Sequence, residues 1–338
     1  MFLADLLAEN LTHPRHLLDH VDLTVADRTT CRGDFVKWRE WGLHLAVCKG
    51  GPREYGDDFA ALWRSQPERR PGRDSEPLFL TSAPHDAARL TLASLERFLQ
   101  QVDAAPDLVR LITRRADLAA CAADGRLGLL LATNRSDWFG DSPTVLRAFA
   151  RLGLRMITLS QAMRDLGYDA FNESRPGGLT DLGMRMLHEM NACGIIIDVS
   201  HTHERSAHEI LDASAHPIVA SHSNPRELEP SPRNASREFM HALAARGGVL
   251  GILPPIERPP GERPYERIPT AQLAASVRII LHAVDVMGPA HVGIGTHFNS
   301  AVLPQLLEAL ADSGLSDEDV RAVAGENFRR ILLEVLPT

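Results

Sequence analysis

The amino-acid sequence predicts an α/β fold, a closed (β/α)8 TIM barrel, on three observations. Eight short apolar runs of strand length recur along the chain. Helical patterns with one apolar face separate several of these runs, and strands that alternate with helices pair in parallel. The chain has 338 residues, a length that fits one large barrel or two ordinary domains. Eight such units favour a closed barrel, and we expect one domain over residues 1–338.

The eight runs are continuously apolar, as parallel strands are when helices cover both faces of the sheet. The strand pattern alone is also compatible with an open, doubly wound sheet, which is the alternative fold. The runs are Leu18–Leu23, Leu43–Cys48, Gly128–Thr133, Leu154–Leu159, Ile195–Ser200, Pro217–Ser221, Val249–Leu253 and His291–Thr296.

Amphipathic stretches lie between the later runs, and three long connections interrupt the alternation. Each long connection follows a predicted strand, so in a barrel it lies on the C-terminal face, where active sites are built. We therefore expect the connections to wall a pocket. The predicted helices are Leu179–Asn191, Glu204–Ala213, Ser236–Ala245 and Thr270–Met287, and the connections are about 49–84, 162–178 and 254–269.

Charge and cysteine content exclude several classes of protein. The net charge is -8, and no cluster of Lys and Arg is typical of a nucleic-acid surface. The four cysteines form no C-x-x-C pair and no disulfide framework, which suits a reducing cytoplasm. We see no secretory signal and no run of 18 uncharged apolar residues, so we expect a cytoplasmic location and no membrane partner. A homodimer is left open.

Histidine and aspartate residues stand at the ends of four predicted strands. His20 and Asp22 end the first run, while His201, His222 and His297 end the fifth, sixth and eighth. A single histidine in such a place is more often structural, but a barrel would bring these five side chains to one rim. Neutral imidazole and carboxylate bind Zn2+ or similar ions, and a catalytic site leaves one position open for water. The sequence therefore predicts a metal site.

Several segments resemble the membrane (renal) dipeptidase family, whose members are amidohydrolase-like barrels. His20-Val-Asp22-Leu is similar to the family's H-x-D-L opening, and the resemblance extends from His20 to Pro337. Its most specific part lies between Gly178 and Gly251. The matching segments there are Gly178-Leu-Thr-Asp-Leu-Gly183, Ile197-Asp-Val-Ser-His201, Ala220-Ser-His-Ser-Asn224, Pro232-Arg-Asn234 and Ala245-Arg-Gly-Gly-Val249.

The resemblance implies a hydrolase of dipeptides with two zinc ions, often one that tolerates a D-residue on the C-terminal side. By motif, His20 and Asp22 would hold one metal, and His201 and His222 the other. Arg233 would bind the substrate carboxylate, a task that suits the bidentate guanidinium.

Three positions depart from the family pattern. Asn134 stands where the family carries a bridging Glu, so the anionic bridge between two cations is lost. Gln161 replaces a histidine, although its amide still donates a hydrogen bond. His297 replaces the carboxylate that would act as proton shuttle. With Arg233, we expect Asn134 and Gln161 to form the substrate-binding set.

Without the bridging carboxylate, two cations would repel with little compensation, so one metal is more plausible than two. His20, Asp22, His201 and His297 could close around a single ion, with His222 as a neighbouring base or a further ligand. We expect His222 and His297 to act in acid–base catalysis. The ligands suit Zn2+ best, and also fit Fe2+, Mn2+ or Cu2+.

Three other side chains have simpler interpretations. Cys48 is expected to be a buried packing thiol, and Asp198 to hydrogen-bond structural partners because it is out of phase with His201. Asp137 follows Asn134 closely and is an alternative source of a carboxylate.

The sequence thus predicts a metal-dependent enzyme of the dipeptidase or amidohydrolase type, acting on a small peptide-like or amino-acid-derived substrate. Ordinary dipeptidase activity is expected to be weak or absent. A non-hydrolytic biosynthetic enzyme on the same scaffold and a catalytically inactive binding protein are the alternatives.

Overall fold

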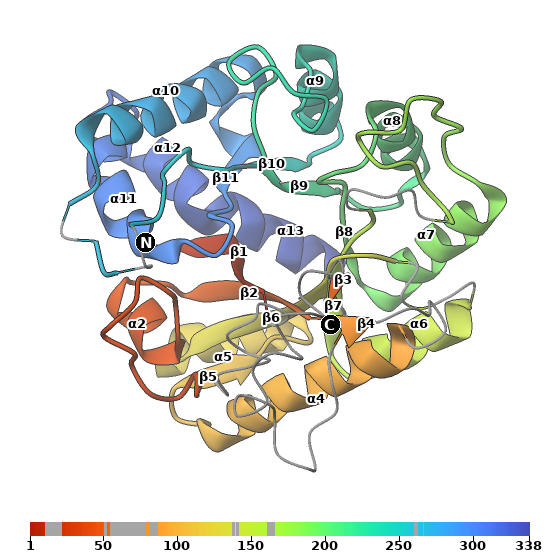
Figure 1. Cartoon of the computed structure of the whole chain (residues 1–338), viewed down its shortest axis with the longest axis horizontal. Helices are drawn as coiled ribbons and strands as arrows, with labels where there is room; N and C mark the ends of the chain where they lie inside the picture. Colours follow the sequence, from red (N-terminus) through yellow and green to blue (C-terminus); the bar gives the residue numbers. More distant parts are fainter. Residues whose placement is uncertain are drawn as a thin grey trace, which may run out of the picture.

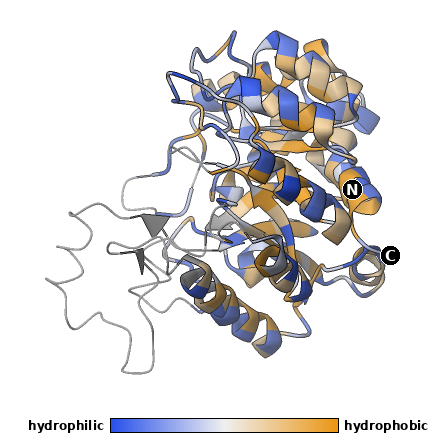
Figure 2. Cartoon of the chain, turned by 90° about the vertical axis from the view of Figure 1, so that its right-hand side faces the viewer, coloured by the Kyte–Doolittle hydropathy of each residue, from blue (hydrophilic) through white to orange (hydrophobic). Residues whose placement is uncertain are grey.

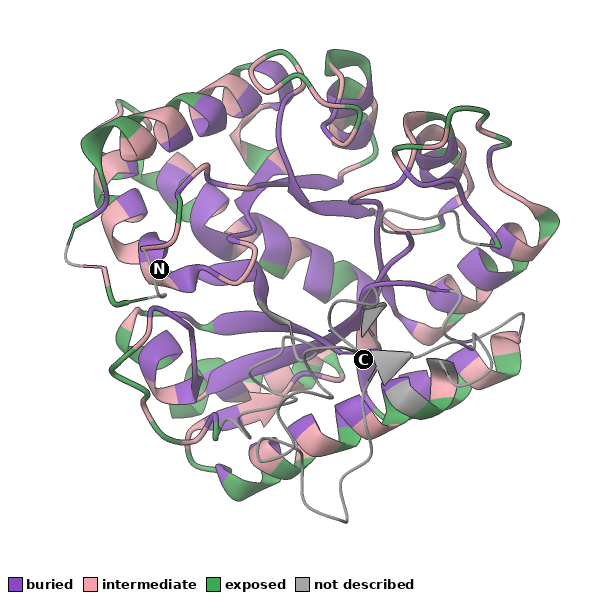
Figure 3. Cartoon of the chain, viewed as in Figure 1, coloured by how far each residue is buried: buried purple, intermediate pink, exposed green. Residues whose placement is uncertain are grey.

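The computed structural model describes residues 1–10, 22–50, 53–54, 79–80, 87–136, 139, 142–160, 166–259, 263–265 and 267–338. Helices surround a central ring of strands, and the buried residues gather on the strands and on the helix faces that contact them (Figure 3). Apolar residues follow the same distribution in the perpendicular view, with hydrophilic residues on the outer surfaces of the helices (Figure 2).

Eight parallel strands form a nearly closed barrel, as the sequence predicts (Figure 1). Two short strands, β3 (Arg53–Glu54) and β4 (Phe79–Leu80), pair separately, and β5 (Val109–Leu111) pairs with the N-terminal half of β6. In sheet order, the barrel strands are β1 (Ala4–Asn10), β2 (Leu45–Gly50), β6 (Leu127–Thr133), β7 (Leu154–Thr158), β8 (Ile196–Asp198), β9 (Val219–Ser223), β10 (Val249–Ile252) and β11 (Val292–Ile294).

Seven of the eight predicted strands are confirmed, and the first is wrong. The barrel begins with β1 at Ala4–Asn10, not with Leu18–Leu23. Asp22 and Leu23 lie in a non-strand segment, and residues 18–21 fall outside the described residues. Asp5 and Glu9 interrupt the apolar character of β1, which hid this strand from a search for continuous apolar runs.

Helices alternate with the strands, and several of them begin at a residue whose side chain caps the helix. Thr180, Ser142 and Ser236 each accept a hydrogen bond from a backbone N–H of the first turn, the usual role of a hydroxyl at that position. The predicted helices Glu204–Ala213 and Thr270–Met287 have these bounds in the structure. The helices are α2 (Phe35–Glu40), α4 (Ala87–Ala104), α5 (Arg115–Asp124), α6 (Pro143–Arg151), α7 (Asp181–Cys193), α8 (Glu204–Ala213), α9 (Arg237–Ala245), α10 (Thr270–Met287), α11 (Leu303–Ala311), α12 (Asp317–Arg321) and α13 (Asn327–Val335).

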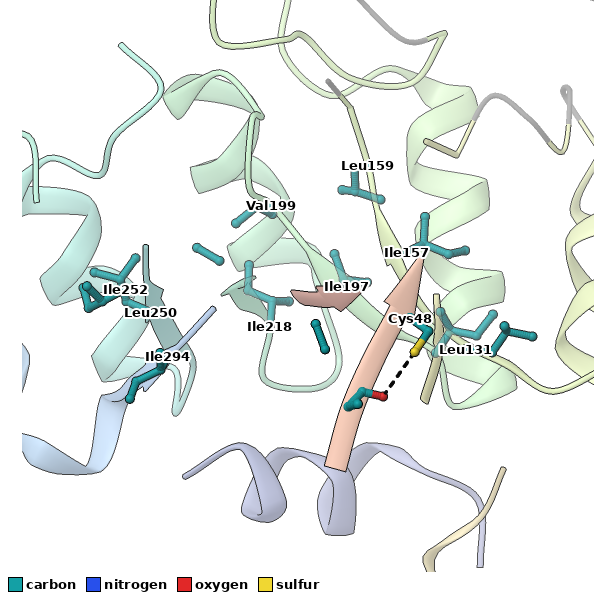
Figure 4. Close-up of a cluster of buried hydrophobic side chains, with 14 of the residues drawn as sticks. Cys48, Leu131, Ile157, Leu159, Ile197, Val199, Ile218, Leu250, Ile252 and Ile294 are labelled. Atoms are coloured by element: carbon teal, nitrogen blue, oxygen red, sulfur yellow. Dashed lines mark hydrogen bonds between the residues drawn. The ribbon is translucent and has the colours of Figure 1, made fainter. Parts of the chain in front are cut away.

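Alternate residues of the strands belong to two hydrophobic clusters, because successive side chains of a strand point to opposite faces. On β2, Leu45 and Val47 join an inner cluster that α13 closes with Phe328. Ala46 and Cys48 join the outer cluster between strands and helices. Figure 4 shows part of that outer cluster, with Cys48 among aliphatic side chains of neighbouring strands. Cys48 is therefore a buried packing residue, as predicted.

A buried carboxylate bridges the two ends of the sheet. Asp5 of β1 accepts hydrogen bonds from the backbone N–H groups of Leu7 and Thr296, each 3.0 Å long. Its other oxygen accepts from the hydroxyls of Thr296 and Ser300. In addition, the N–H of Phe298 donates to the carbonyl of Leu7 over 2.9 Å. These bonds join β1 to the segment after β11 where no strand ladder forms.

One helix of the described chain, α10, is long and apolar enough to cross a membrane by length and composition alone. In this structure α10 lies on the outside of the barrel beside α9 and α11 (Figure 1). Its buried face includes Ile279, Ile280 and Ala283. A barrel helix that packs on strands meets the same criterion as a membrane span, and α10 is placed as a barrel helix.

Candidate functional site

Two histidines meet at the C-terminal ends of β8 and β9. His201 follows β8 by three residues, and His222 lies within β9. Their Nε2 atoms are 2.9 Å apart, and their ring centroids are 4.9 Å apart. His222 is buried, with 3% of its surface exposed. The structure thus brings together the two predicted site histidines of the central motif block.

His297 joins this pair from the other side of the barrel mouth. Its ring centroid lies 5.5 Å from that of His222. His201, His297 and Phe298 have positive φ angles of 67°, 53° and 70°, and they are the non-glycine residues with positive φ in the described chain. Such backbone conformations are costly and persist where surrounding structure imposes them, often at functional sites. All three lie at this cluster.

Two arginines contact the histidine cluster. The Arg233 guanidinium donates from Nε to Nδ1 of His201 over 3.4 Å and from Nη2 to the carbonyl oxygen of His222 over 3.3 Å. Arg258, in the segment after β10, donates from Nη2 to the carbonyl oxygen of His297 over 2.7 Å. The long connection after β10 therefore places a guanidinium at the cluster, and the rim carries positive charge.

A buried ion pair lies beneath the histidines, and the sequence analysis did not find it. Lys49, the fifth residue of β2, is fully buried, and its ammonium lies 2.9 Å from Oδ2 of Asp198. The same ammonium contacts the hydroxyls of Thr158 and Ser221. Lys49 has the same strand phase as the inward-facing Leu45 and Val47, and that phase was the signal available in the sequence.

The site holds its imidazoles in the neutral form. Burial lowers the pKa of His201 and His222 well below the ordinary histidine value, and the nearby charges of Arg233 and Lys49 act in the same direction. Burial, Arg233 and Arg258 lower the pKa of His297 to about 3. These three side chains are therefore uncharged at neutral pH.

The aspartate of the predicted H-x-D pair lies away from a strand end. Asp22 is exposed, and its Oδ1 accepts hydrogen bonds from the N–H and hydroxyl of Thr24 over 2.8 and 2.6 Å. The strand that we predicted to end in His20 and Asp22 is wrong, because the first barrel strand is β1, and the role of these two residues as metal ligands stays a prediction. His20, Gln161 and Asp137 fall outside the described residues. Asn134 directly follows β6 and is buried.

The described side chains do not fit a metal centre on their own. Among the residues that the structure describes, no group of three or more His, Cys, Asp or Glu side chains is placed to hold an ion. The carboxylate beneath the histidine pair, Asp198, is engaged by Lys49. Charges of Lys49 and Arg233 oppose a further cation at close range. The described part of the cluster thus offers neutral imidazoles flanked by cationic side chains, and the predicted ligand His20 lies outside the described residues.

An open groove of about 420 Å³ lies over the first half of α8, the start of α9 and nearby loop residues. Phe171 contributes to its wall, and the Phe171 ring centroid lies 5.9 Å from that of His201. Apart from Pro232, the remaining lining is polar and includes His203, Arg226 and Glu238. The site histidines themselves are not part of the lining.

Comparison with known families gives one match over most of the chain. A family model described as membrane dipeptidase, peptidase family M19, matches residues 56–337. The matched range contains His201, His222, Arg233 and His297, and it leaves out β1 and β2.

Individual relatives agree with this match. Dipeptidase verJ of Clonostachys rogersoniana is 29% identical over 282 residues, which cover 78% of this chain and 69% of the relative. Dipeptidase tcpJ of Claviceps purpurea (strain 20.1) is 29% identical over 265 residues, covering 72% of this chain and 61% of the relative. The chain thus spans about two thirds of the length of these curated relatives.

A solved structure shares the whole fold. The metallo peptidase from Rhodobacter sphaeroides, crystallised with a phosphinate mimic of the dipeptide L-Ala-D-Ala, superposes with a TM-score of 0.79 at 21% identity, over 99% of each chain. At that identity the similarity is one of fold.

Proposed function

The chain belongs to the membrane dipeptidase family, peptidase family M19, a family of metal-dependent hydrolases, and we propose that it acts on a small peptide-like or amino-acid-derived substrate through a carboxylate bound at Arg233. One observation carries the proposal: the half-buried guanidinium of Arg233 lies against the His201–His222 pair at the barrel mouth. A guanidinium in this position binds a carboxylate through two parallel N–H donors.

We further propose that ordinary dipeptidase turnover is weak. A general base works best when its pKa is near the operating pH, and the pKa of His297 is about 3. At neutral pH the imidazole of His297 is therefore a weak base. Asn134, which stands where the family carries a carboxylate, is uncharged and orients a ligand only through its amide dipole.

We propose at most one tightly bound divalent ion per chain. The support is the charge of the described donors, which are imidazoles flanked by Lys49 and Arg233, with Asp198 already paired. Anionic ligands are what offset the repulsion between two close cations. Asn134 supplies no such charge.

One set of measurements on the full chain tests these proposals. Steady-state assays on L,L and L,D dipeptides with added Zn2+ should give turnover well below the usual range of about 1–1,000 per second. Calorimetry should show dipeptide binding that Arg233→Met weakens at least about tenfold, corresponding to about 1.4 kcal/mol. Elemental analysis after purification without chelator should give no more than one equivalent of metal.

Arg237→Met is the matched control, because Arg237 is exposed on α9 and pairs with Glu227. It should leave dipeptide affinity unchanged. Turnover inside the usual range would contradict weak activity, and unchanged affinity in Arg233→Met would remove Arg233 from the site. Two strongly occupied metals would contradict the single-ion proposal.

A further inference from the structure

Arg233 lies in a short segment between β9 and α9 that its own backbone closes into a loop. Pro225 and Ala235 form an isolated parallel bridge at the two ends of this segment. The backbone N–H of Arg226 also donates to the carbonyl oxygen of Ala235 over 2.8 Å. Within the loop, the N–H of Arg233 donates to the Ser231 hydroxyl over 3.2 Å. The position of the Arg233 side chain therefore depends on what holds this loop.

The side chain of Arg226 holds the loop on both sides of Arg233. Its Nε donates to the carbonyl oxygen of Ser231 over 3.2 Å, and its Nη2 donates to that of Asn234 over 2.7 Å. These two carbonyls precede and follow Arg233 in the sequence. A guanidinium has several N–H donors in a fixed planar arrangement, so one side chain can bind both. Arg226 thus determines the path of the backbone around Arg233.

Arg226 also joins the loop to α8. Its Nη2 lies 2.6 Å from Oε2 of Glu204, the first residue of α8. The other carboxylate oxygen of Glu204 accepts a hydrogen bond from the hydroxyl of Ser236, which caps α9. The ion pair therefore fixes the Arg233 loop, which follows β9, against the connection after β8 that carries His201.

The contribution of this ion pair to stability is small. The side chains of Arg226 and Glu204 are 36% and 25% exposed. Ion pairs within reach of water contribute little to the free energy of unfolding, because solvent screens the charges. Loss of the Arg226 charge should therefore change the surroundings of Arg233 more than the stability of the barrel.

Glu204, Arg226 and Arg233 line one small cavity. Its volume is about 20 Å³, enough to admit a water molecule. A carboxylate and a guanidinium that line the same cavity attract each other, and the attraction is stronger where little water intervenes. Without the Arg226 charge, Glu204 would have Arg233 as a cationic neighbour across this cavity. A Glu204–Arg233 pair would occupy the guanidinium that we propose for the substrate carboxylate.

We propose that Arg226 is a positioning residue for Arg233: it holds the loop around Arg233 and occupies the Glu204 carboxylate, so that the Arg233 guanidinium stays available to the carboxylate of the substrate. This role rests on the carboxylate binding proposed above for Arg233. It adds a rule of selectivity, because the preference for a ligand with a free carboxylate then depends on the charge of Arg226, which acts through Arg233.

The test compares two probes on the full chain by calorimetric titration, the dipeptide L-Ala-D-Ala and its C-terminal amide. The amide has nearly the same size and lacks the negative charge, so the ratio of the two dissociation constants reports carboxylate recognition. In the wild-type protein the dipeptide should bind at least about tenfold more tightly than the amide, as expected for hydrogen bonds between charged groups. Equal affinities would overturn the carboxylate proposal and this one with it.

Arg226→Met should bring the two affinities to within about threefold of each other, by weakening the binding of the dipeptide. The released Glu204 carboxylate then pairs with Arg233 in place of the ligand. Binding of the amide should stay within about twofold of wild type, which a general loss of structure would not allow. A folded Arg226→Met protein with the wild-type ratio would overturn the role of Arg226 and leave the carboxylate proposal standing.

The double variant Arg226→Met/Glu204→Gln distinguishes this role from a purely structural one. It removes the competing carboxylate and keeps the size of the side chain. The preference for the dipeptide should increase by at least about threefold over that of Arg226→Met. A structural role predicts no recovery, since the double variant has lost more contacts. Absence of recovery would show that Glu204 does not compete for Arg233, and would overturn the proposal.

Arg226→Gln is the second variant, in case Arg226→Met does not fold. Its amide can still donate a hydrogen bond to a loop carbonyl but carries no charge. It should lower the preference for the dipeptide as Arg226→Met does. The wild-type ratio in this variant would also overturn the proposal.

Arg237→Met is the matched control. Arg237 also forms an ion pair with a glutamate of this loop, Glu227, but neither residue lines the cavity beside Arg233. The variant should leave the affinities for both probes unchanged. A fall in the ratio as large as that in Arg226→Met would show that any ion pair of the loop has this effect, and would overturn the specific role of Arg226.

Discussion

Asp5 and Asp198 are two fully buried carboxylates with nearly the same surroundings and different tasks. Each accepts two backbone N–H bonds on Oδ1 and two hydroxyl bonds on Oδ2. The difference is one ammonium, that of Lys49, beside Asp198. Asp5 bridges β1 to the segment after β11, whereas Asp198 lies beneath the histidine pair.

That single charge reverses the direction of the pKa shift. Burial raises the pKa of Asp5, although its four hydrogen bonds act to lower it. Burial also acts to raise the pKa of Asp198, but Lys49 together with the hydrogen bonds of Ser221 and Thr158 lowers it. Hydrogen-bond donors are thus enough to bury a carboxylate in this barrel. A buried cation is what keeps one ionised next to the site.

The largest expected effect is that of Asp198→Ala. It leaves the Lys49 ammonium buried without a counter-charge, and loss of one partner of a buried pair costs about 3–5 kcal/mol of unfolding free energy. Urea denaturation at pH 7 measures it. The double variant Lys49→Met/Asp198→Asn leaves no buried charge and should lose much less. Equal losses in the single and double variants would contradict the pairing.

Asp5→Ala should have a smaller effect. It leaves the donors of Leu7, Thr296 and Ser300 without their acceptor, which lowers the unfolding free energy by about 2–3 kcal/mol. No buried charge loses its partner. Asp5→Asn should cost less, because its amide oxygen still accepts from the two backbone N–H groups. Urea denaturation again applies. A loss in Asp5→Ala as large as that in Asp198→Ala would show that the ammonium makes no difference.

The smallest effect is on acid stability, and its sign differs between the two carboxylates. Asp198, with a lowered folded pKa, contributes stability that is present above the unfolded pKa and is lost as pH falls through the folded value. Asp5, with a raised pKa, contributes stability that is present below the unfolded pKa and is lost as pH rises through the folded value. Each carboxylate changes the unfolding free energy by at most about 1.4 kcal/mol per pH unit.

Unfolding free energies between pH 3 and 7 test this difference. Asp198→Asn should flatten the acid side of the profile, and Asp5→Asn should steepen the rise toward neutral pH. Changes of the same sign in both variants would contradict the comparison.

Most of the fold could be predicted because its signals are local. The runs around Val249–Leu253 and Gly128–Thr133 are apolar over the length of a strand, and Glu204–Ala213 has an apolar helical face. β1 was not predicted because it contains a buried aspartate. The partners that satisfy Asp5, Thr296 and Ser300, are far away in the sequence. The first strand was predicted at Leu18–Leu23 because this run contains the His20-Val-Asp22 tripeptide.

The site residues that could be predicted also lie in local sequence motifs, and the one that was missed does not. His201, His222 and Arg233 lie in contiguous motifs, and the structure brings them together. Lys49 lies in no motif, and its partners on β7, β8 and β9 are separated from it by 109, 149 and 172 residues. A lysine is ordinarily solvated, so only the inward phase of β2 distinguished it.

The join at Asp5 also sets the order in which the barrel can be completed during synthesis. Its partner Thr296 lies 291 residues further along the chain. At about 5–20 residues per second, β1 leaves the ribosome roughly 15–60 s before the segment that completes its pairing. Contacts so distant in sequence form slowly, and an unpaired strand edge is open to pairing with other chains in the meantime. One edge of β1 therefore stays without its partner until the segment after β11 has been made.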